Sequence, residues 1–245
     1  MLDLRQGDCL EVMKEIPDES IDMILCDLPY GTTACKWDTV IPFEPLWKQY
    51  KRIIKDDGII ILFGSEPFSS KLRMSNLKMY KYDLVWKKSR PSNFQLAKKQ
   101  PMKYHENIIV FYNKQPKYNP IMIEAGIKNK KISKNNKTTN NITGNDINFV
   151  SNTSTKRYPK SILEFNSVCN SHNRYHSTQK PIELLEYLIK TYSNEGETIL
   201  DNCMGSGSTG VACINTNRNF IGIELDENYY KIACERIHNT QEKVS

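Results

Sequence analysis

Short apolar runs recur along the chain and alternate with charged or amphipathic segments. Most of these runs are rich in Ile and Val, which favours strands buried on both faces of a sheet. The predicted strands cover residues 2–6, 21–26, 58–64, 82–86, 107–112, 197–200 and 219–225.

Between several of these runs the apolar residues recur at helical spacing. Leu46, Tyr50 and Ile53 share one face of the first such segment, and a proline and an aspartate begin the next two. Strands that alternate with helices predict an α/β fold with a doubly wound, mostly parallel sheet. The predicted helices cover residues 43–54, 181–192 and 226–237.

One region breaks the alternation. Residues 113–165 are rich in Lys, Asn and Thr, poor in apolar residues and without a sustained period. Such a segment is typical of a disordered linker, or of an insertion that becomes ordered on its target. We therefore divide the chain into 1–112, 113–165 and 166–245.

The chain has 245 residues, 39% of them hydrophobic, enough for one core with an inserted lobe. Its net charge of +6 is unevenly distributed, because residues 71–160 hold 20 Lys/Arg and 4 acidic residues while the remainder is acidic. A basic middle between acidic ends predicts a polyanion-binding surface. The alternative is a solvated, lysine-rich surface loop.

Several classes of protein are disfavoured. No apolar run approaches the ~20 residues that a membrane-spanning helix needs, and the charged N-terminus is unlike a signal peptide. The seven cysteines form no C-x-x-C pair and the four histidines have no metal-ligand spacing. We expect a reduced, cytoplasmic protein without a metal site.

The segment "TILDNCMGSGSTGVACINTNRNFIGIELD" predicts a nucleotide-type pocket. Gly205 and Gly207 allow a tight turn, and Ser208 and Thr209 begin a helix whose free N–H groups point into the crevice. Glu224 ends the next strand, where a carboxylate can bind a ribose diol. No lysine follows the glycines, which excludes a Walker phosphate loop, but "GSGSTG" keeps a dinucleotide-binding alternative open.

The tetrapeptide Asp27-Leu28-Pro29-Tyr30 directly follows a predicted strand and carries an acid to the edge of the sheet. Taken alone, it is also typical of an ordinary turn with a surface aspartate and a core tyrosine.

Together these segments resemble the DNA amino-methyltransferases, which use S-adenosylmethionine to modify adenine N6 or cytosine N4. The tetrapeptide resembles their D-P-P-Y motif, "LDNCMGSGSTG" their D-P-F-x-G-S-G-T-T loop, and "HSTQKP" their H-P-T-Q-K-P segment. The order of the motifs is that of the permuted β arrangement, with a target-recognition region between the two halves. Leu28, the pair Asn202-Cys203 and Ser177 depart from these motifs.

The resemblance implies a Rossmann-like, S-adenosylmethionine-dependent fold. Residues 1–112 would be its catalytic half, 113–165 the inserted target-recognition region and 166–245 its cofactor-binding half. It implies a site-specific enzyme that methylates a base swung out of duplex DNA. Asp27 favours adenine N6, because cytosine-N4 members more often have serine there. A cytosine-N4 enzyme and a non-catalytic DNA-binding module are the alternatives. Relatives that act on protein glutamine or on RNA generally have the reverse motif order.

The chemistry explains why this family needs such residues. The exocyclic amine is a poor nucleophile, because its lone pair is delocalised into the ring. Two acceptors would free the lone pair and stabilise the charge that develops on nitrogen: the Asp27 carboxylate, and the main-chain carbonyl of Leu28 or Pro29, of which the resemblance favours Pro29. Tyr30 would hold the extruded base by its flat face.

The resemblance and the charge pattern together give the following candidates. Trp86 or Phe94 would line the base pocket, although Trp86 is equally typical of the core. We expect duplex DNA as partner and a bacterial or bacteriophage origin; the resemblance leaves a cognate restriction endonuclease and a homodimer open. The predicted catalytic residues are Asp27, Pro29 and Tyr30, the cofactor-binding residues Asp8, Cys9, Thr178, Gln179, Lys180, Asp201, Cys203, Gly205, Ser206, Gly207, Ser208, Thr209 and Glu224, and the DNA-binding residues Lys87, Lys88, Arg90, Asn93, Lys98, Lys99, Lys156 and Arg157.

Overall fold

The structure is a computed structural model. It describes residues 1–32, 38–124, 138–139, 146–147, 155–168 and 179–244. The chain forms two compact units, one of residues 1–119 with 161–245 and the other of Pro120–Lys160.

The first unit contains an eight-stranded sheet among its described residues. Seven strands run in one direction, and β5 alone is antiparallel to its neighbours β3 and β4. In spatial order the strands are β1 (Leu2–Gln6), β12 (Asn219–Glu224), β11 (Thr198–Asp201), β2 (Ile21–Cys26), β3 (Ile54–Gly64), β5 (Lys103–Tyr112), β4 (Tyr80–Ser92) and β10 (Ile162–Phe165).

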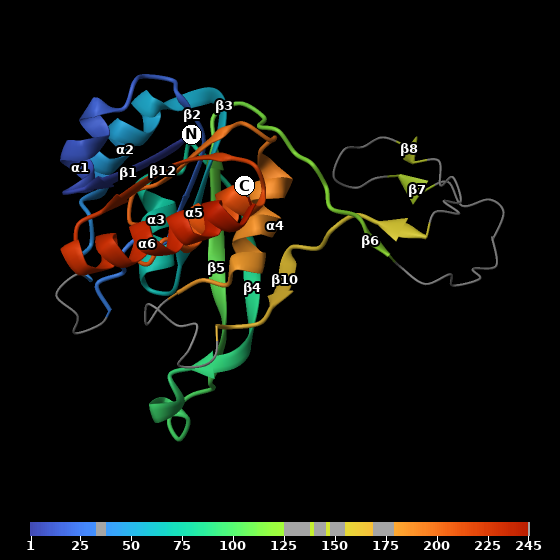
Figure 1. Cartoon of the computed structure of the whole chain (residues 1–245). Coiled ribbons are helices and arrows are strands. Elements are labelled where there is room, and N and C mark those ends of the chain that lie inside the picture. Colours follow the sequence, from blue (N-terminus) through green and yellow to red (C-terminus); the bar gives the residue numbers. More distant parts are fainter. Residues whose placement is uncertain (33–37, 125–137, 140–145, 148–154, 169–178, 245) are drawn as a thin grey trace. The chain divides into compact units, whose positions relative to one another are not determined.

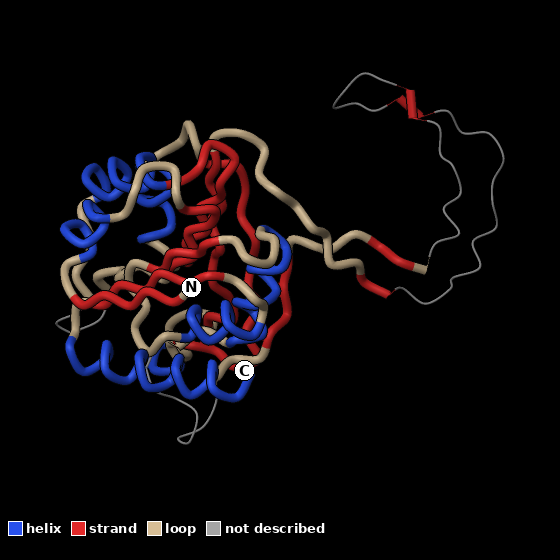
Figure 2. The backbone as a smooth tube through the Cα atoms, turned by 45° about the horizontal axis from the view of Figure 1, so that its top comes forward, coloured by secondary structure: helices blue, strands red, loops and turns tan. Residues whose placement is uncertain are grey.

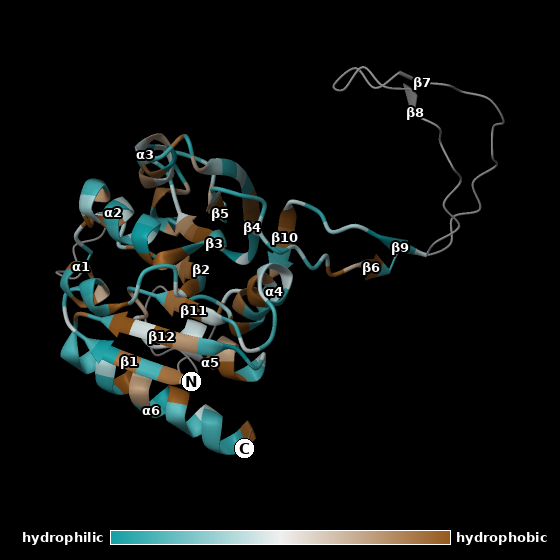
Figure 3. Ribbon diagram, turned by 90° about the horizontal axis from the view of Figure 1, so that it is seen from above, coloured by the Kyte–Doolittle hydropathy of each residue, from teal (hydrophilic) through white to brown (hydrophobic). Residues whose placement is uncertain are grey.

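Helices cover both faces of this sheet (Figures 1 and 2). One apolar cluster joins a face of the sheet to α4, α5 and α6, and a second joins the opposite face to α1, α2 and α3. Strand β2 is buried at every residue and is strongly hydrophobic in Figure 3, as a central strand between two helical layers must be. The helices are α1 (Cys9–Val12), η1 (Met13–Glu15), α2 (Phe43–Ile53), α3 (Phe68–Ser75), η2 (Phe94–Leu96), α4 (Ile182–Tyr192), α5 (Ser208–Asn215) and α6 (Glu227–Val244).

The second unit has little regular structure among its described residues. Its short strands β6 (Ile123–Glu124) and β9 (Lys156–Arg157) pair antiparallel, as do β7 (Thr138–Thr139) and β8 (Asp146–Ile147).

The predicted α/β class and mostly parallel sheet are confirmed. Several elements were missed, among them α3 and the strand β10. Strand β3 begins four residues before the predicted strand, and this start was missed because residues 55–57 are polar. The compact second unit is narrower than the predicted insertion 113–165. Asn119 donates its backbone N–H to the Thr191 carbonyl at 2.7 Å, and β10 pairs with β4, so both flanks belong to the first unit.

Parallel strands bring the carboxyl ends of β1, β12, β11 and β2 to one edge of the sheet. The residues at or just beyond these ends are Asp8, Glu224, Asp201 and Asp27. Within the described residues, no helix is long and apolar enough to cross a membrane.

We expect the α4 interface to dominate the stability of the first unit. Leu188→Ala removes a side chain that is fully buried on α4, which should lower the free energy of unfolding by about 2–5 kcal/mol in urea titrations. The control is Leu77→Ala at a position 57% exposed, which should change it by less than about 0.5 kcal/mol. Equal effects of the two substitutions would contradict this core.

Candidate active site

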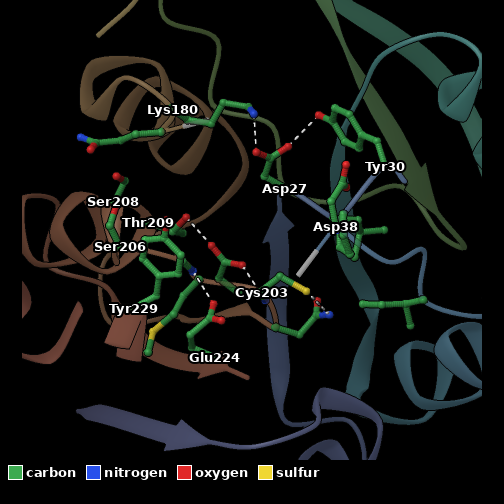
Figure 4. Close-up of a pocket in the computed structure, with 18 of the residues that line it drawn as sticks. Asp27, Tyr30, Asp38, Lys180, Cys203, Ser206, Ser208, Thr209, Glu224 and Tyr229 are labelled. Atoms are coloured by element: carbon green, nitrogen blue, oxygen red, sulfur yellow. Dashed lines mark hydrogen bonds and ion pairs between the residues drawn. The ribbon is translucent and has the colours of Figure 1, made fainter. Parts of the chain in front are cut away.

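A cavity of about 770 Å³ opens at the carboxyl edge of the sheet. Both halves of the sequence contribute to its wall, since Asp27 lies just after β2 and the glycine loop lies between β11 and α5 (Figure 4). Among the predicted residues that line it are Asp8, Cys9, Asp27, Pro29, Tyr30, Lys88, Arg90, Gln179, Lys180, Asp201, Cys203, Gly205, Ser206, Ser208, Thr209 and Glu224.

Two donors hold the Asp27 carboxylate. The Tyr30 hydroxyl donates to Oδ1 at 2.6 Å, and the Lys180 ammonium forms an ion pair and hydrogen bond with Oδ2 (Figure 4). One face of the Tyr30 ring stacks on Phe68, with ring centroids 4.9 Å apart. Burial and the neighbouring Asp27 charge raise the pKa of Tyr30 well above its usual value, so its hydroxyl stays protonated.

Lys180 also faces a second carboxylate. Its Nζ lies 3.3 Å from Glu106 Oε2, and Glu106 forms a further ion pair with Lys88. Burial lowers the pKa of Lys180, but Asp27 and Glu106 outweigh it and raise that pKa above the ordinary value. Burial opposes ionisation of Glu106 too, yet Lys180 and Lys88 bring its pKa below the usual range. Asp27, Lys180, Glu106 and Lys88 therefore form one network in which two positive and two negative charges balance.

Asp38 holds the loop that follows the tetrapeptide. Its carboxylate accepts the backbone N–H of Gly31 at 2.8 Å and of Thr32 at 2.9 Å. Gly31 has φ of +66°, where a side chain would be strained and would meet Val40. Hydrogen bonds therefore hold the tetrapeptide at Asp27 and also directly after Tyr30, at Gly31 and Thr32.

Two carboxylates at the ends of β11 and β12 accept hydrogen bonds from the glycine loop and the start of α5. Asp201 accepts the Thr209 hydroxyl at 2.6 Å and the Cys203 N–H at 3.1 Å, and burial raises the pKa of Asp201 to about 6. Glu224 accepts the Gly205 N–H at 2.8 Å, and burial raises its pKa as well. Each carboxylate keeps lone pairs for a further donor.

The start of α5 is tied to α6. Arg236 donates to the Ser206 carbonyl at 2.9 Å and to the Ser208 hydroxyl at 3.0 Å. Gly207 has φ of +78° and does not line the cavity; a Cβ there would come within 2.9 Å of Ile237. The cofactor-binding role of Gly207 stays a prediction, and in this structure the residue lies close to Ile237.

Three thiols, those of Cys9, Cys26 and Cys203, lie at or next to the cavity wall. Hydrogen bonding to Cys203 and burial raise the pKa of Cys9, and burial first raises the pKa of Cys26 to about 12. A hydrogen bond with the Cys26 thiol, together with burial, raises the pKa of Cys203 well above its usual value. These groups stay protonated and are poor nucleophiles, which argues against a covalent cysteine intermediate.

The wall suits a cationic cofactor of nucleoside type. Its volume lies in the range of small-molecule sites, and its acids outnumber its bases. The acids are Asp8, Asp27, Asp38, Glu106, Asp201 and Glu224, and the bases are Lys88, Arg90 and Lys180.

Comparison with known proteins decides the family. A family model of N6 and N4 enzymes, described as DNA methylase, matches residues 21–235. The chain belongs to this family. The methylase is 27% identical to the type II methyltransferase M.HpaI of Haemophilus parainfluenzae over 94% of this chain and 72% of that protein. It is 29% identical to the DNA adenine methyltransferase YhdJ of Escherichia coli over 94% of this chain and 81% of that protein.

Solved structures support the fold. The methylase aligns with the crystal structure of an M1.HpyAVI–SAM complex with a TM-score of 0.67 and 22% identity, covering 97% of this chain and 99% of that one.

The residues predicted to bind DNA lie in different surroundings. Lys87 is exposed and pairs with Glu164 at 3.1 Å, whereas Lys88 points inward to Glu106. Alternation along β4 explains this, because Lys88 continues the buried face of Leu84 and Trp86. The phosphate contact of Lys88 stays a prediction, and in this structure its ammonium pairs with Glu106.

The remaining predicted positions are spread over three regions. Trp86 is buried in the core and also borders the cavity, and its contact with a base stays a prediction. Arg90 borders the cavity, Asn93, Lys98 and Lys99 lie on the β4–β5 hairpin, Lys156 and Arg157 form β9 of the second unit, and Thr178 is outside the described residues.

Glu106 and Asp38 are the main residues that sequence reasoning missed. Glu106 stands in step with Ile108 and Val110, so the period of two already placed a carboxylate on the buried face. Asp38 follows the tetrapeptide without any periodic signal, and only the fold shows its role.

We expect Glu106→Gln to weaken methyl transfer through Lys180. Within the part of the chain that the structure describes, removing this charge leaves Asp27 as the only carboxylate paired with the Lys180 ammonium, so the pKa of Lys180 should fall. The rate constant kcat should drop by about tenfold, and its decline at alkaline pH should begin at lower pH. Cofactor affinity, measured by calorimetry, should stay within about twofold.

Glu164→Gln is the matched control. It removes the carboxylate that pairs with Lys87 in an exposed ion pair between β10 and β4. This variant should keep the wild-type rate and pH profile, since exposed ion pairs contribute little. A Glu106→Gln enzyme with an unshifted alkaline limb would refute the coupling.

Proposed function

We propose that the protein transfers the methyl group of S-adenosylmethionine to N6 of an adenine swung out of duplex DNA. The observation that carries this proposal is the position of the Asp27 carboxylate. It lies in the same cavity as the glycine loop, although 174 residues separate it from Asp201 in the chain. An acceptor for the amine and a site for the methyl donor thus share one space.

Asp27 would activate the amine. Lys180 occupies Oδ2, which leaves Oδ1 to accept an N–H of the base. The Pro29 carbonyl would accept the other N–H, and together they free the nitrogen lone pair. S-adenosylmethionine, when bound, supplies a methyl group on a sulfonium. The nitrogen gains that methyl group and loses one proton, which Asp27 accepts.

Tyr30 would exchange partners when the base enters. Its hydroxyl donates to Oδ1 at 2.6 Å and must release it for the amine. Phe68 covers one face of the ring, so the base would stack on the other. The hydroxyl keeps Asp27 in position until the substrate arrives.

Adenine is favoured over cytosine on two grounds. Asp27 stands where cytosine-N4 members more often have serine, and the relative YhdJ is an adenine methyltransferase. The complete network of Asp27, Tyr30 and Lys180 speaks against a non-catalytic DNA-binding module.

The basic residues would bind the DNA backbone. We assign target recognition to the insertion 113–165, where Lys156 and Arg157 are exposed on β9. A cognate endonuclease and a homodimer stay predictions from the family resemblance.

We expect Asp27→Asn to abolish most transfer. The isosteric amide cannot accept an N–H at the nitrogen that replaces Oδ1 or Oδ2, so kcat should fall by about 100-fold or more. Cofactor affinity should be unchanged. Labelled S-adenosylmethionine and duplex DNA measure the transfer, and digestion to nucleosides identifies the methylated base.

Tyr30→Phe is the companion variant, since it keeps the ring and removes only the hydroxyl. It should retain at least about a third of the wild-type rate. If the digest contains N4-methylcytosine, the target base is cytosine and not adenine. If Asp27→Asn transfers methyl groups at the wild-type rate, the role proposed for this carboxylate is wrong.

A further inference from the structure

The β4–β5 hairpin extends from the mouth of the cavity. Arg90, Pro91 and Ser92, the last residues of β4, line the cavity wall, and Ser92 pairs with Lys103 of β5. Residues 93–102, here called the hairpin tip, therefore begin one residue beyond the wall. In Figure 1 the hairpin projects away from the body of the sheet.

The hairpin tip has a defined internal structure. Asn93 adopts φ of +62°, and its side-chain oxygen accepts the Lys103 N–H at 2.8 Å. The turn of helix η2 follows, in which Leu96 donates its N–H to the Asn93 carbonyl at 2.9 Å. Lys99 donates to the Leu96 carbonyl at 2.8 Å. The tip can therefore present its side chains with little loss of conformational entropy on binding.

Apolar side chains on the tip face solvent. Phe94 is 67% exposed, and Leu96 and Met102 are 41% and 42% exposed. Three such residues within nine positions give the tip exposed apolar surface, here called the apolar group.

The charge of the same segment selects the partner. Between Lys87 and Lys103 the sequence contains no acidic residue, and Lys98 and Lys99 are exposed beside the apolar group. A polyanion with apolar interior surfaces fits this combination, and stacked bases between phosphates have both properties. An apolar protein partner would not require the lysines.

We propose that Phe94 inserts into the base stack next to the extruded nucleotide and fills the gap that this nucleotide leaves. The inference rests on the proposed function and names the element that assists extrusion. Unstacking opposes extrusion, and an aromatic ring that occupies the gap restores the lost stacking. Leu96 and Met102 would contact the neighbouring sugars, while Lys98 and Lys99 neutralise phosphates.

The test compares Phe94→Ala with Phe94→Trp on the duplex site that methylation-aware sequencing identifies. Phe94→Ala should lower kcat/KM by about tenfold or more on the paired duplex, and Phe94→Trp should restore it. With 2-aminopurine at the target position, Phe94→Ala should also lose most of the fluorescence rise that reports extrusion. Cofactor affinity should not change.

A second substrate separates insertion from a general structural effect. Opposite an abasic site the target base is already unpaired, so Phe94→Ala should recover most of its activity there. Met74→Ala on α3 is the control, because Met74 is 68% exposed and does not line the cavity.

The possible outcomes are distinct. Wild-type rates for Phe94→Ala on the paired duplex, or an equal loss on both duplexes, would overturn the insertion while leaving methyl transfer intact. If the wild-type protein labels no DNA, the proposed function fails instead.

Discussion

A buried ammonium between two carboxylates is the interaction on which the site depends. Lys180 comes from the C-terminal half of the chain and Asp27 and Glu106 from the N-terminal half, so this contact joins the two halves at the cavity. Burying charges is unfavourable unless they are paired and hydrogen-bonded. The network meets that condition because Lys88 supplies a second cation for the second carboxylate. Removing one of these four side chains leaves a buried charge without its partner. The same ion pairs therefore stabilise the carboxyl edge of the sheet and position the Asp27 carboxylate.

The rest of the site is held by the same kind of self-binding. The carboxylates of Asp201, Glu224 and Asp38 each accept a hydrogen bond from a backbone N–H or a hydroxyl group of the segments that form the cavity wall. Arg236 adds donors from α6 to the serines of the glycine loop. These contacts hold the described parts of the loops in place from within the protein, which favours binding with little further ordering.

The sequence alone predicted the layers and the edge at which the site lies, because apolar runs mark buried strands and parallel strands share one carboxyl edge. It also brought Asp27 and Gly205 together from distant positions. It missed the start of β3, since Lys55 and the two residues after it are polar. It did not predict the ion pair of Lys88 with Glu106, because the basic composition of the middle segment outweighed the alternation of Lys88 with Trp86. Asp38 and the Lys180 partners depend on tertiary contacts that no local pattern contains.

Charge movement during the reaction explains why Glu106 matters. Methyl transfer moves a positive charge from sulfur to nitrogen, so the net charge of the cavity does not change. Only groups nearer the nitrogen than the sulfur can favour the transition state over the bound substrate. In the proposed reaction Asp27 would be such a group, but the Lys180 ammonium on its Oδ2 would oppose the developing charge. Glu106 offsets that ammonium from the far side. Lys180 can then fix the direction of the Asp27 carboxylate without cancelling its effect on the amine.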